Sequence, residues 1–231
     1  MKSPLVVFDL DGTLVDTAPD LVATLNAILA REGVPPVDYE TARNFVGGGT
    51  RLMVERGFLA SGRNLPSAAL DGYTRDFIEH YAGHIADSSV AFPGVEAALD
   101  TLAERGYRFA VCTNKVEKLS LMLLDALGLS KRFAVICGAD TFGVIKPDPE
   151  ILHRTIARAG AASDGAVMVG DSITDIATAR AANIPVIAVD FGYTDTPVAT
   201  LAPDCIISRF ADLPAAVHAL VGPGPLILAD S

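Results

Sequence analysis

Residues 5–14 constrain the fold of this chain more than any other stretch. Four apolar residues at positions 5–8 run directly into two aspartates, Asp9 and Asp11, with a glycine and a threonine behind them. A short, fully apolar run is typical of a strand inside a parallel sheet, because both faces of such a sheet are covered. Ligands of parallel α/β folds bind beyond the carboxyl ends of the strands. The sequence therefore predicts a buried strand that ends at a functional site.

Helical and strand-like segments alternate from residue 92 onward, which is the pattern of βαβ units. Further strands are expected at 107–112, 134–137, 166–169, 185–189 and 205–207. Helices are expected near 95–104, 115–127, 149–159, 174–182 and 212–221, and the tail at 222–231 is expected to be peripheral. The segment before residue 90 has helical patterns only, near 18–31, 39–46, 50–60 and 67–86.

These patterns predict an α/β fold built on a doubly wound, Rossmann-like parallel sheet. Residues 1–16 and 90–231 are expected to form the catalytic core, and residues 17–89 an inserted, all-helical cap domain that sets substrate specificity. The chain has 231 residues, of which 50% are hydrophobic, so it is long and apolar enough to bury a core.

Charge and composition exclude several partners. The net charge of −10 argues against binding to nucleic acid or to an anionic membrane, since either partner requires a basic surface. No run reaches the roughly 18 apolar residues of a membrane-spanning helix, and no signal peptide is evident. We expect a soluble, cytoplasmic protein. The three cysteines, Cys112, Cys137 and Cys205, are far apart in apolar runs and are expected to be buried free thiols.

Polar side chains follow the expected strands at the points where these strands end. Thr113 and Asn114 come after the second strand, Lys146 lies in the loop after the third, and Asp171 and Ser172 follow the fourth. Sequential right-handed crossovers bring the carboxyl ends of parallel strands to one edge of a sheet. The sequence therefore predicts one site that joins these side chains to the two aspartates of the first strand.

The residue types in this site favour metal-dependent phosphoryl chemistry. Clustered carboxylates repel one another and so imply a cation, and oxygen ligands alone favour Mg²⁺ over zinc. One carboxylate can attack phosphorus to form an aspartyl-phosphate, while a second can protonate the leaving oxygen and then activate water. Thr113 and Lys146 are suited to bind phosphoryl oxygens, as a hydroxyl donor and as a point charge.

Two alternative motifs fail on residue identity. A calcium loop of the pattern D-x-[DN]-x-[DN]-G needs Asp or Asn at position 13 and Gly at position 14, where Thr13 and Leu14 stand. A dinucleotide fingerprint at the triple glycine fails because Leu52 replaces the last glycine of G-x-G-x-x-G and no strand precedes it. The triple glycine is therefore interpreted either as a flexible loop between helices or as a substrate contact.

Taken in order, four motifs resemble those of the haloacid dehalogenase superfamily of phosphohydrolases, and the resemblance covers the whole chain. The motifs are residues 9–13, 113–114, 146–147 and 170–175.

The resemblance also implies roles for individual residues. Asp9 is implied as the nucleophile and a metal ligand, and Asp11 as the general acid/base that also binds the metal through its main-chain carbonyl. Asp171 is implied as the third metal ligand. Asp175, with Ser172, is implied as a supporting residue that either reaches the metal through water or pairs with Lys146. The phosphate-binding residues are then Thr113, Asn114 and Lys146.

The helical insertion resembles the cap of the subclass that includes phosphoglycolate phosphatases. Residues 15–21 resemble the stretch that follows the first motif in that group, and residues 46–50 resemble its glycine-rich cap loop. By this likeness the cap closes over the substrate and selects the leaving group. The two arginines beside the loop are interpreted either as ligands of a substrate carboxylate or as solvated helix residues. The predicted specificity residues are Arg43, Gly47, Gly48, Gly49 and Arg51.

Some related activities are less favoured. Haloacid dehalogenases lack the second acid, which is Asp11 here, and phosphonoacetaldehyde hydrolases use a cap lysine, whereas residues 17–90 contain none. Sugar phosphomutases carry a histidine where Leu21 stands, which disfavours a mutase without excluding it. Signalling receiver domains, which are non-enzymatic phospho-acceptors, also join Asp, Thr and Lys on a doubly wound sheet. The cap and the paired acids favour turnover over such a switch.

The leading expectation is a Mg²⁺-dependent phosphomonoesterase that acts on a small phosphorylated metabolite, with 2-phosphoglycolate as the best single candidate. Inorganic pyrophosphate, sugar phosphates and nucleotides are the alternatives, because cap geometry decides the leaving group. No nucleic-acid or membrane partner is expected, and both a monomer and a homodimer are compatible with the sequence.

Overall fold

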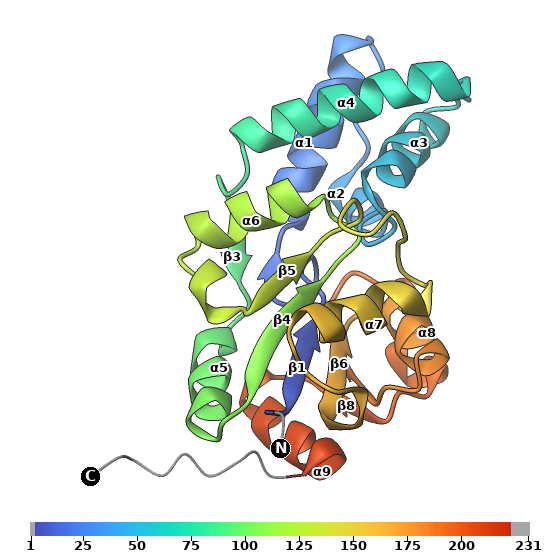
Figure 1. The fold of residues 1–231 in the computed structure, drawn as a ribbon. Helices are drawn as coiled ribbons and strands as arrows, with labels where there is room; N and C mark the ends of the chain where they lie inside the picture. Colours follow the sequence, from blue (N-terminus) through green and yellow to red (C-terminus); the bar gives the residue numbers. More distant parts are fainter. Residues whose placement is uncertain (1–2, 223–231) are drawn as a thin grey trace.

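A six-stranded parallel sheet forms the centre of the molecule in a computed structural model that describes residues 3–222 (Figure 1). Its strand order is β5–β4–β1–β6–β7–β8, so β1 lies between β4 and β6. The strands are β1 Leu5–Phe8, β4 Arg108–Cys112, β5 Val135–Cys137, β6 Ala166–Gly170, β7 Val186–Val189 and β8 Cys205–Ile207. The α/β fold with a doubly wound parallel sheet is therefore confirmed. Of the tail expected to be peripheral, residues 223–231 lie outside the described residues.

Helices cover both faces of the sheet, and the alternation of side chains along each strand decides which face a residue joins. In β1, Val6 and Phe8 pack with α5, α6 and α9, whereas Leu5 and Val7 pack with α7 and α8. All four side chains are fully buried, as expected for a central parallel strand. The flanking helices are α5 Val95–Glu104, α6 Glu117–Ala126, α7 Pro149–Arg158, α8 Ile173–Ala181 and α9 Leu213–Val221.

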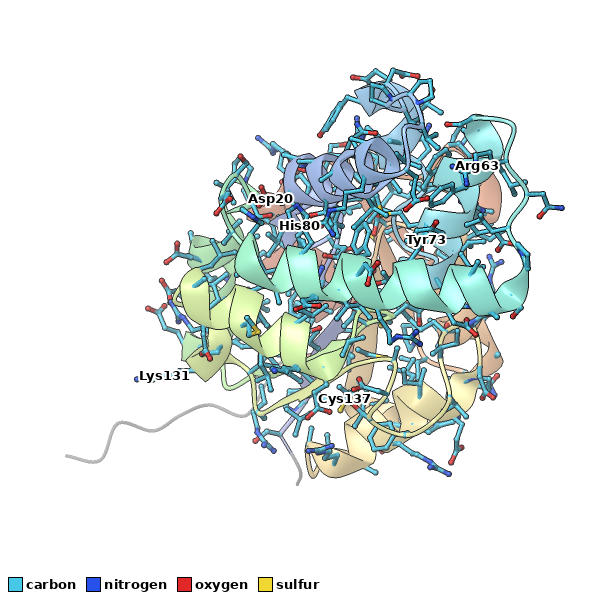
Figure 2. All side chains as sticks on the ribbon, turned by 90° about the horizontal axis from the view of Figure 1, so that it is seen from above. Asp20, Arg63, Tyr73, His80, Lys131 and Cys137 are labelled. Carbon is cyan, nitrogen blue, oxygen red and sulfur yellow. The ribbon has the colours of Figure 1, made fainter. Side chains whose placement is uncertain are left out.

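Four further helices lie together beyond the carboxyl ends of the strands, at the end of the molecule opposite α9 (Figure 1). They are α1 Ala18–Arg31, α2 Tyr39–Arg43, α3 Thr50–Ala60 and α4 Ser67–Gly83. Their apolar side chains form a hydrophobic cluster separate from the two that flank the sheet. Seen from above, these helices and their side chains cover the edge of the core (Figure 2). The cap boundaries at residues 17 and 89 stay a prediction.

The chain passes between the core and these helices twice, and the two crossings pair with each other. Strand β2 Val15–Asp16 lies antiparallel to β3 Val90–Ala91. The Asp20 carboxylate, at the start of α1, accepts hydrogen bonds from the main-chain N–H groups of Ser88 and Ser89 and from the Ser89 hydroxyl. These two-residue strands were not predicted, because a pattern of alternation cannot be recognised over so few residues.

Several predicted elements differ at their ends, and one cysteine was misjudged. The helix expected at 67–86 ends at Gly83, and the one expected at 39–46 ends at Arg43.

All three cysteines are free, and Cys112 and Cys137 are buried, but Cys205 is only partly buried. The prediction of burial was wrong for Cys205 because β8 is an edge strand with one open flank. Within residues 3–222, no helix combines the length and apolarity needed to cross a membrane.

Candidate active site

The three central strands end side by side and present their polar residues to one place. Asp9 follows β1, and its N–H donates to the carbonyl of Val169 in β6, which continues the ladder past the end of the strand. Thr113 follows β4 and Asp171 follows β6. Asp9, Asp171 and Asp175 each offer a carboxylate oxygen, and these oxygens all lie within 4.8 Å of one another. The predicted convergence of Asp9, Thr113 and Asp171 is what the strand order produces.

Lys146 lies within this cluster and pairs with two of the acids. Its Nζ is 2.8 Å from Asp9 Oδ1 and 2.6 Å from Asp175 Oδ1, and all three side chains are buried. The loop that carries Lys146 is held by Asn114, whose Oδ1 accepts from the Lys146 N–H at 2.9 Å and whose Nδ2 donates to the Lys146 carbonyl at 3.1 Å. Asn114 thus positions Lys146; a direct contact between Asn114 and phosphate stays a prediction.

Ser172 and Asp175 lie at the start of helix α8, and their hydrogen bonds hold the acid cluster in place. The Ser172 hydroxyl accepts from the Asp175 N–H, and Asp175 Oδ2 accepts from the Ser172 N–H, which is a capping box. Asp175 Oδ2 also accepts from the Asp171 N–H at 3.2 Å and from the Ser172 hydroxyl at 2.7 Å. Both Asp175 oxygens are therefore engaged. Of the two sequence interpretations, the structure contains the pairing of Asp175 with Lys146.

Asp171 is held from two sides. Its Oδ1 accepts from the Thr13 hydroxyl at 2.9 Å, and its Oδ2 accepts from the Tyr193 N–H at 2.9 Å. Gly12 packs closely against the same carboxylate: its φ is +85°, and a Cβ built there would lie 2.6 Å from Asp171 Oδ2. Glycine at position 12 is therefore required both by the backbone conformation and by the approach of Asp171.

The positive charge of Lys146 does not fully offset the negative charges of the three clustered carboxylates. Burial, with the nearby Asp175 charge, raises the pKa of Asp9 to about 8, although Lys146 acts in the opposite direction. Burial and Asp175 likewise raise the pKa of Asp171 to about 7, against hydrogen bonds from Tyr193 and Thr13. Buried carboxylates that resist ionisation in this way, and that offer only oxygen donors, fit a hard cation such as Mg²⁺.

Asp11 faces a second buried lysine that the sequence analysis did not single out. Lys115 Nζ lies 2.9 Å from Asp11 Oδ1 and 3.2 Å from Oδ2, and both side chains are buried. Burial disfavours the charged form of Lys115, but the Asp11 carboxylate and the Tyr81 side chain together outweigh it and raise the pKa of the ammonium above its ordinary value. The available sequence signal was position: Lys115 directly follows Thr113 and Asn114 at the end of a central strand.

A small cavity of about 30 Å³ lies between the sheet edge and the helices above it. The core contributes acids, a hydroxyl and Lys115, while the helices contribute mainly apolar groups. Gly47 and Gly49 of the triple glycine reach this cavity, whereas Gly48 lines a separate depression beside Asp171 and Tyr193. The lining residues are Asp9, Asp11, Leu21, Val46, Gly47, Gly49, Thr50, Met53, Phe77, Tyr81, Thr113, Asn114, Lys115 and Leu119.

The two arginines predicted to bind substrate do not line this cavity. Arg51 is exposed and pairs with Asp71 at 3.0 Å. Arg43 donates to the Gly192 carbonyl at 3.0 Å and lies 5.3 Å from the centre of the Tyr193 ring. Arg43 therefore joins the helices to the core loop that also holds Asp171. The role of either arginine in substrate binding stays a prediction that this arrangement does not support.

Tyr193 is a further residue that the sequence analysis missed. Its N–H holds Asp171, while its hydroxyl accepts from the Ala18 N–H at 3.0 Å and donates to the Asp16 carboxylate. One side chain thus connects the acid cluster to the start of the helical segment. No sequence motif marks it, because it lies in an irregular loop after β7.

Comparison with known proteins identifies what the chain resembles. The family model for haloacid dehalogenase-like hydrolases matches residues 6–189. The chain is 50% identical over 210 residues to a phosphoglycolate phosphatase of Mesorhizobium japonicum, covering 91% of this chain and 92% of that protein. It is 47% identical over 223 residues to a phosphoglycolate phosphatase of Agrobacterium fabrum, covering 96% of each.

Solved structures give the same result at the level of the fold. A crystal structure described as a predicted phosphoglycolate phosphatase from Haemophilus somnus 129pt superposes with a TM-score of 0.85 at 29% identity. The match covers 92% of this chain and 97% of that chain.

Proposed function

The chain belongs to the haloacid dehalogenase-like hydrolases, and on that premise we propose that it is a Mg²⁺-dependent phosphomonoesterase whose substrate is 2-phosphoglycolate. The observation that carries the reaction class is the cluster of three buried carboxylates at the strand ends, two of which pair with Lys146, beside a cavity that Asp9 lines. The substrate is proposed from the relatives named phosphoglycolate phosphatase.

Hydrolysis proceeds in two steps in this proposal. The Asp9 carboxylate attacks phosphorus, the bond between phosphorus and the ester oxygen breaks, and Asp11 donates a proton to the leaving glycolate oxygen. Asp11 then takes a proton from water, and the resulting hydroxide attacks the aspartyl-phosphate to release phosphate and restore Asp9. Splitting the reaction in this way lets one acid act as nucleophile and the other as proton carrier.

The surrounding residues bind and orient. Lys146 and the Thr113 hydroxyl would hold phosphoryl oxygens, a role supported by Asn114, which fixes Lys146 through its main chain. A Mg²⁺ ion held by Asp9, Asp171 and the Asp11 carbonyl would supply positive charge against the phosphoryl group. Asp175 and Ser172 keep Lys146 and the Asp171 main chain in place. The helices above the cavity limit the access of water.

Phosphate release from 2-phosphoglycolate tests this proposal, with and without Mg²⁺, alongside pyrophosphate, a sugar phosphate and a nucleotide. We expect turnover only with a divalent cation, with 2-phosphoglycolate ranking first by kcat/KM. A higher rank for another ester would overturn the substrate and leave the reaction class standing. Absence of turnover with every ester, in a protein shown to be folded, would overturn the reaction class. Magnesium, the cytoplasmic location and the oligomeric state stay predictions until measured.

A further inference from the structure

The cavity above the acid cluster has a single positively charged side chain in its wall. Among its lining residues in the described part of the chain, Lys115 is the one with a cationic group, whereas Asp9 and Asp11 are acidic. Lys146, the other buried lysine among the described residues, pairs with Asp9 and Asp175 and does not line this cavity. If a substrate carries a second anionic group besides its phosphate, Lys115 is the one full positive charge that this wall offers to it.

Lys115 is fixed in place by partners from both the core and the helices above. Its Nζ pairs with Asp11 on the core side and lies 4.4 Å from the centre of the Tyr81 ring of α4. The side chain is almost fully buried, and the adjacent Asp11 carboxylate, 2.9 Å away, offsets the cost of burying its charge. Lys115 can still bind another anion beside Asp11 and the Tyr81 ring. Lys146 in the same site shows that one buried lysine can pair with two carboxylates at once.

Two further sources of hydrogen-bond donors, the Tyr81 hydroxyl and the start of helix α3, lie around the same space. Tyr81 is fully buried and lines the cavity, and its hydroxyl interacts with Lys115, itself a donor, so the O–H has no acceptor among the described residues. Helix α3 begins at the cavity with Gly49 and Thr50, and no side chain caps its first N–H groups. A helix start carries partial positive charge, so both features favour an anionic acceptor beside Lys115. Leaving a buried hydroxyl unpaired costs free energy, and a bound carboxylate would remove that cost.

We propose that Lys115 binds the carboxylate of the substrate and so selects phosphate esters that carry an acid group on a short carbon chain. This role rests on the proposed phosphatase function and assigns to Lys115 the selectivity that the sequence suggested for Arg43 and Arg51. Both arginines have other partners and lie outside the cavity wall. Lys115 would hold the carboxylate while the phosphoryl group lies at Asp9 and Thr113.

The test compares two esters that differ in one group. 2-Phosphoglycolate carries a carboxylate, and 2-hydroxyethyl phosphate has a neutral hydroxyl on the same carbon skeleton. Their kcat/KM values with Mg²⁺ are measured for the wild type and for Lys115→Met, Lys115→Gln and Lys115→Arg. The matched control is Lys118→Met, which removes an exposed lysine three residues further along. Melting temperatures establish that each variant is folded.

We expect the preference of the wild type for 2-phosphoglycolate to fall roughly 10- to 100-fold in Lys115→Met and Lys115→Gln, the range for a lost charged hydrogen bond. The loss should arise mainly in KM, Lys115→Arg should retain part of the preference, and Lys118→Met should not change it. Equal losses for both esters would show that Lys115 serves only to pair with Asp11, and would overturn the proposal. A wild type without preference for the carboxylate ester would overturn it as well.

Calorimetric binding separates this proposal from the proposed function. In an Asp9→Asn background with Mg²⁺, we expect 2-phosphoglycolate to bind more tightly than 2-hydroxyethyl phosphate, and Lys115→Gln to remove the difference. This measurement does not need turnover. Failure of the wild type to hydrolyse any ester would therefore end the proposed function, while the binding difference would still decide the role of Lys115. If Lys115→Gln still bound 2-phosphoglycolate more tightly than 2-hydroxyethyl phosphate by the same factor, carboxylate binding by Lys115 would be excluded.

Discussion

The Lys146 ammonium lies 2.6 Å from the Asp175 carboxylate, and neither side chain has appreciable contact with solvent. The same ammonium lies 2.8 Å from Asp9. Lys146 thus joins the residue proposed to attack phosphorus to the residue that starts helix α8. Its charge supports the fold and the reaction at once, so the two roles have to be measured separately.

Replacing Lys146 by Met should destabilise the protein by about 3–5 kcal/mol, because two buried carboxylates lose their cationic partner. Urea unfolding followed by circular dichroism measures this loss. The control is Lys131→Met, which removes an exposed lysine (Figure 2) and should change the free energy of unfolding by less than about 0.5 kcal/mol. Equal effects of the two substitutions would contradict the buried pairing.

The pKa of Asp9 predicts how the stability of the metal-free protein depends on pH. Its folded value, about 8, lies above the ordinary value of 3.8, so the folded state binds a proton more tightly than the unfolded state does. The associated stability is complete below about pH 4 and is lost as the pH rises to about 8. With a chelator present, wild type should therefore lose stability relative to Asp9→Asn across this window, by up to about 1.4 kcal/mol per pH unit. A difference that stays constant with pH would contradict the shift.

Magnesium should stabilise the folded protein. A ligand at one hundred times its Kd adds about 2.7 kcal/mol, which a rise in melting temperature at pH 8 would report. Asp171→Asn should remove most of this rise, because it deletes one of the clustered carboxylates. Asp164→Asn, at an exposed position before β6, should leave the rise intact. A rise that persists in Asp171→Asn would place the cation elsewhere.

Alanine at position 12 should disturb the acid cluster in particular. Gly12 and Gly62 both have positive φ, so alanine is strained at either position by about 1 kcal/mol. Only at Gly12 would the added Cβ contact Asp171, at 2.6 Å from Oδ2; at Gly62 it would meet nothing within 4 Å. We expect Gly12→Ala to raise the Mg²⁺ concentration needed for half-maximal activity by at least roughly tenfold and Gly62→Ala to leave it unchanged.

The Tyr193 hydroxyl should matter for stability rather than for metal binding. Phenylalanine would leave the Ala18 N–H without its acceptor, at a cost of about 1–3 kcal/mol. The Tyr193 N–H, which holds Asp171, is unaffected by the change. For Tyr193→Phe, chemical unfolding should therefore show reduced stability, while Mg²⁺ titration should show unchanged affinity. The control is Tyr39→Phe, at a well-exposed tyrosine. A large loss of Mg²⁺ affinity would show that the hydroxyl positions Asp171 as well.

The sequence was sufficient for the sheet and for the residues at its strand ends. Apolar runs followed by polar residues mark buried parallel strands, and the topology of such sheets brings Asp9, Thr113 and Asp171 together whatever the details of the loops. Lys146 could be anticipated as part of the site because it follows a predicted strand. Its pairing with Asp175 was one of two open possibilities, since spacing alone does not say which way a long side chain turns.

The contacts between the core and the helical segment could not be predicted. Arg51 flanks the glycine loop in sequence, yet its guanidinium turns to Asp71 on α4, and this depends on how α3 and α4 pack. Lys115 and Tyr193 reach their partners across long separations in the chain, 104 residues from Lys115 to Asp11 and 175 from Tyr193 to Ala18. Local pattern carries no information on such pairs.

The pairing of the two chain crossings has a mechanical consequence. Strands β2 and β3 are hydrogen-bonded to each other, and Asp20 ties the first turn of α1 to residues 88 and 89. Two joined strands resist twisting more than two separate linkers do. We therefore expect the helical segment to move relative to the core as one unit about this short ribbon.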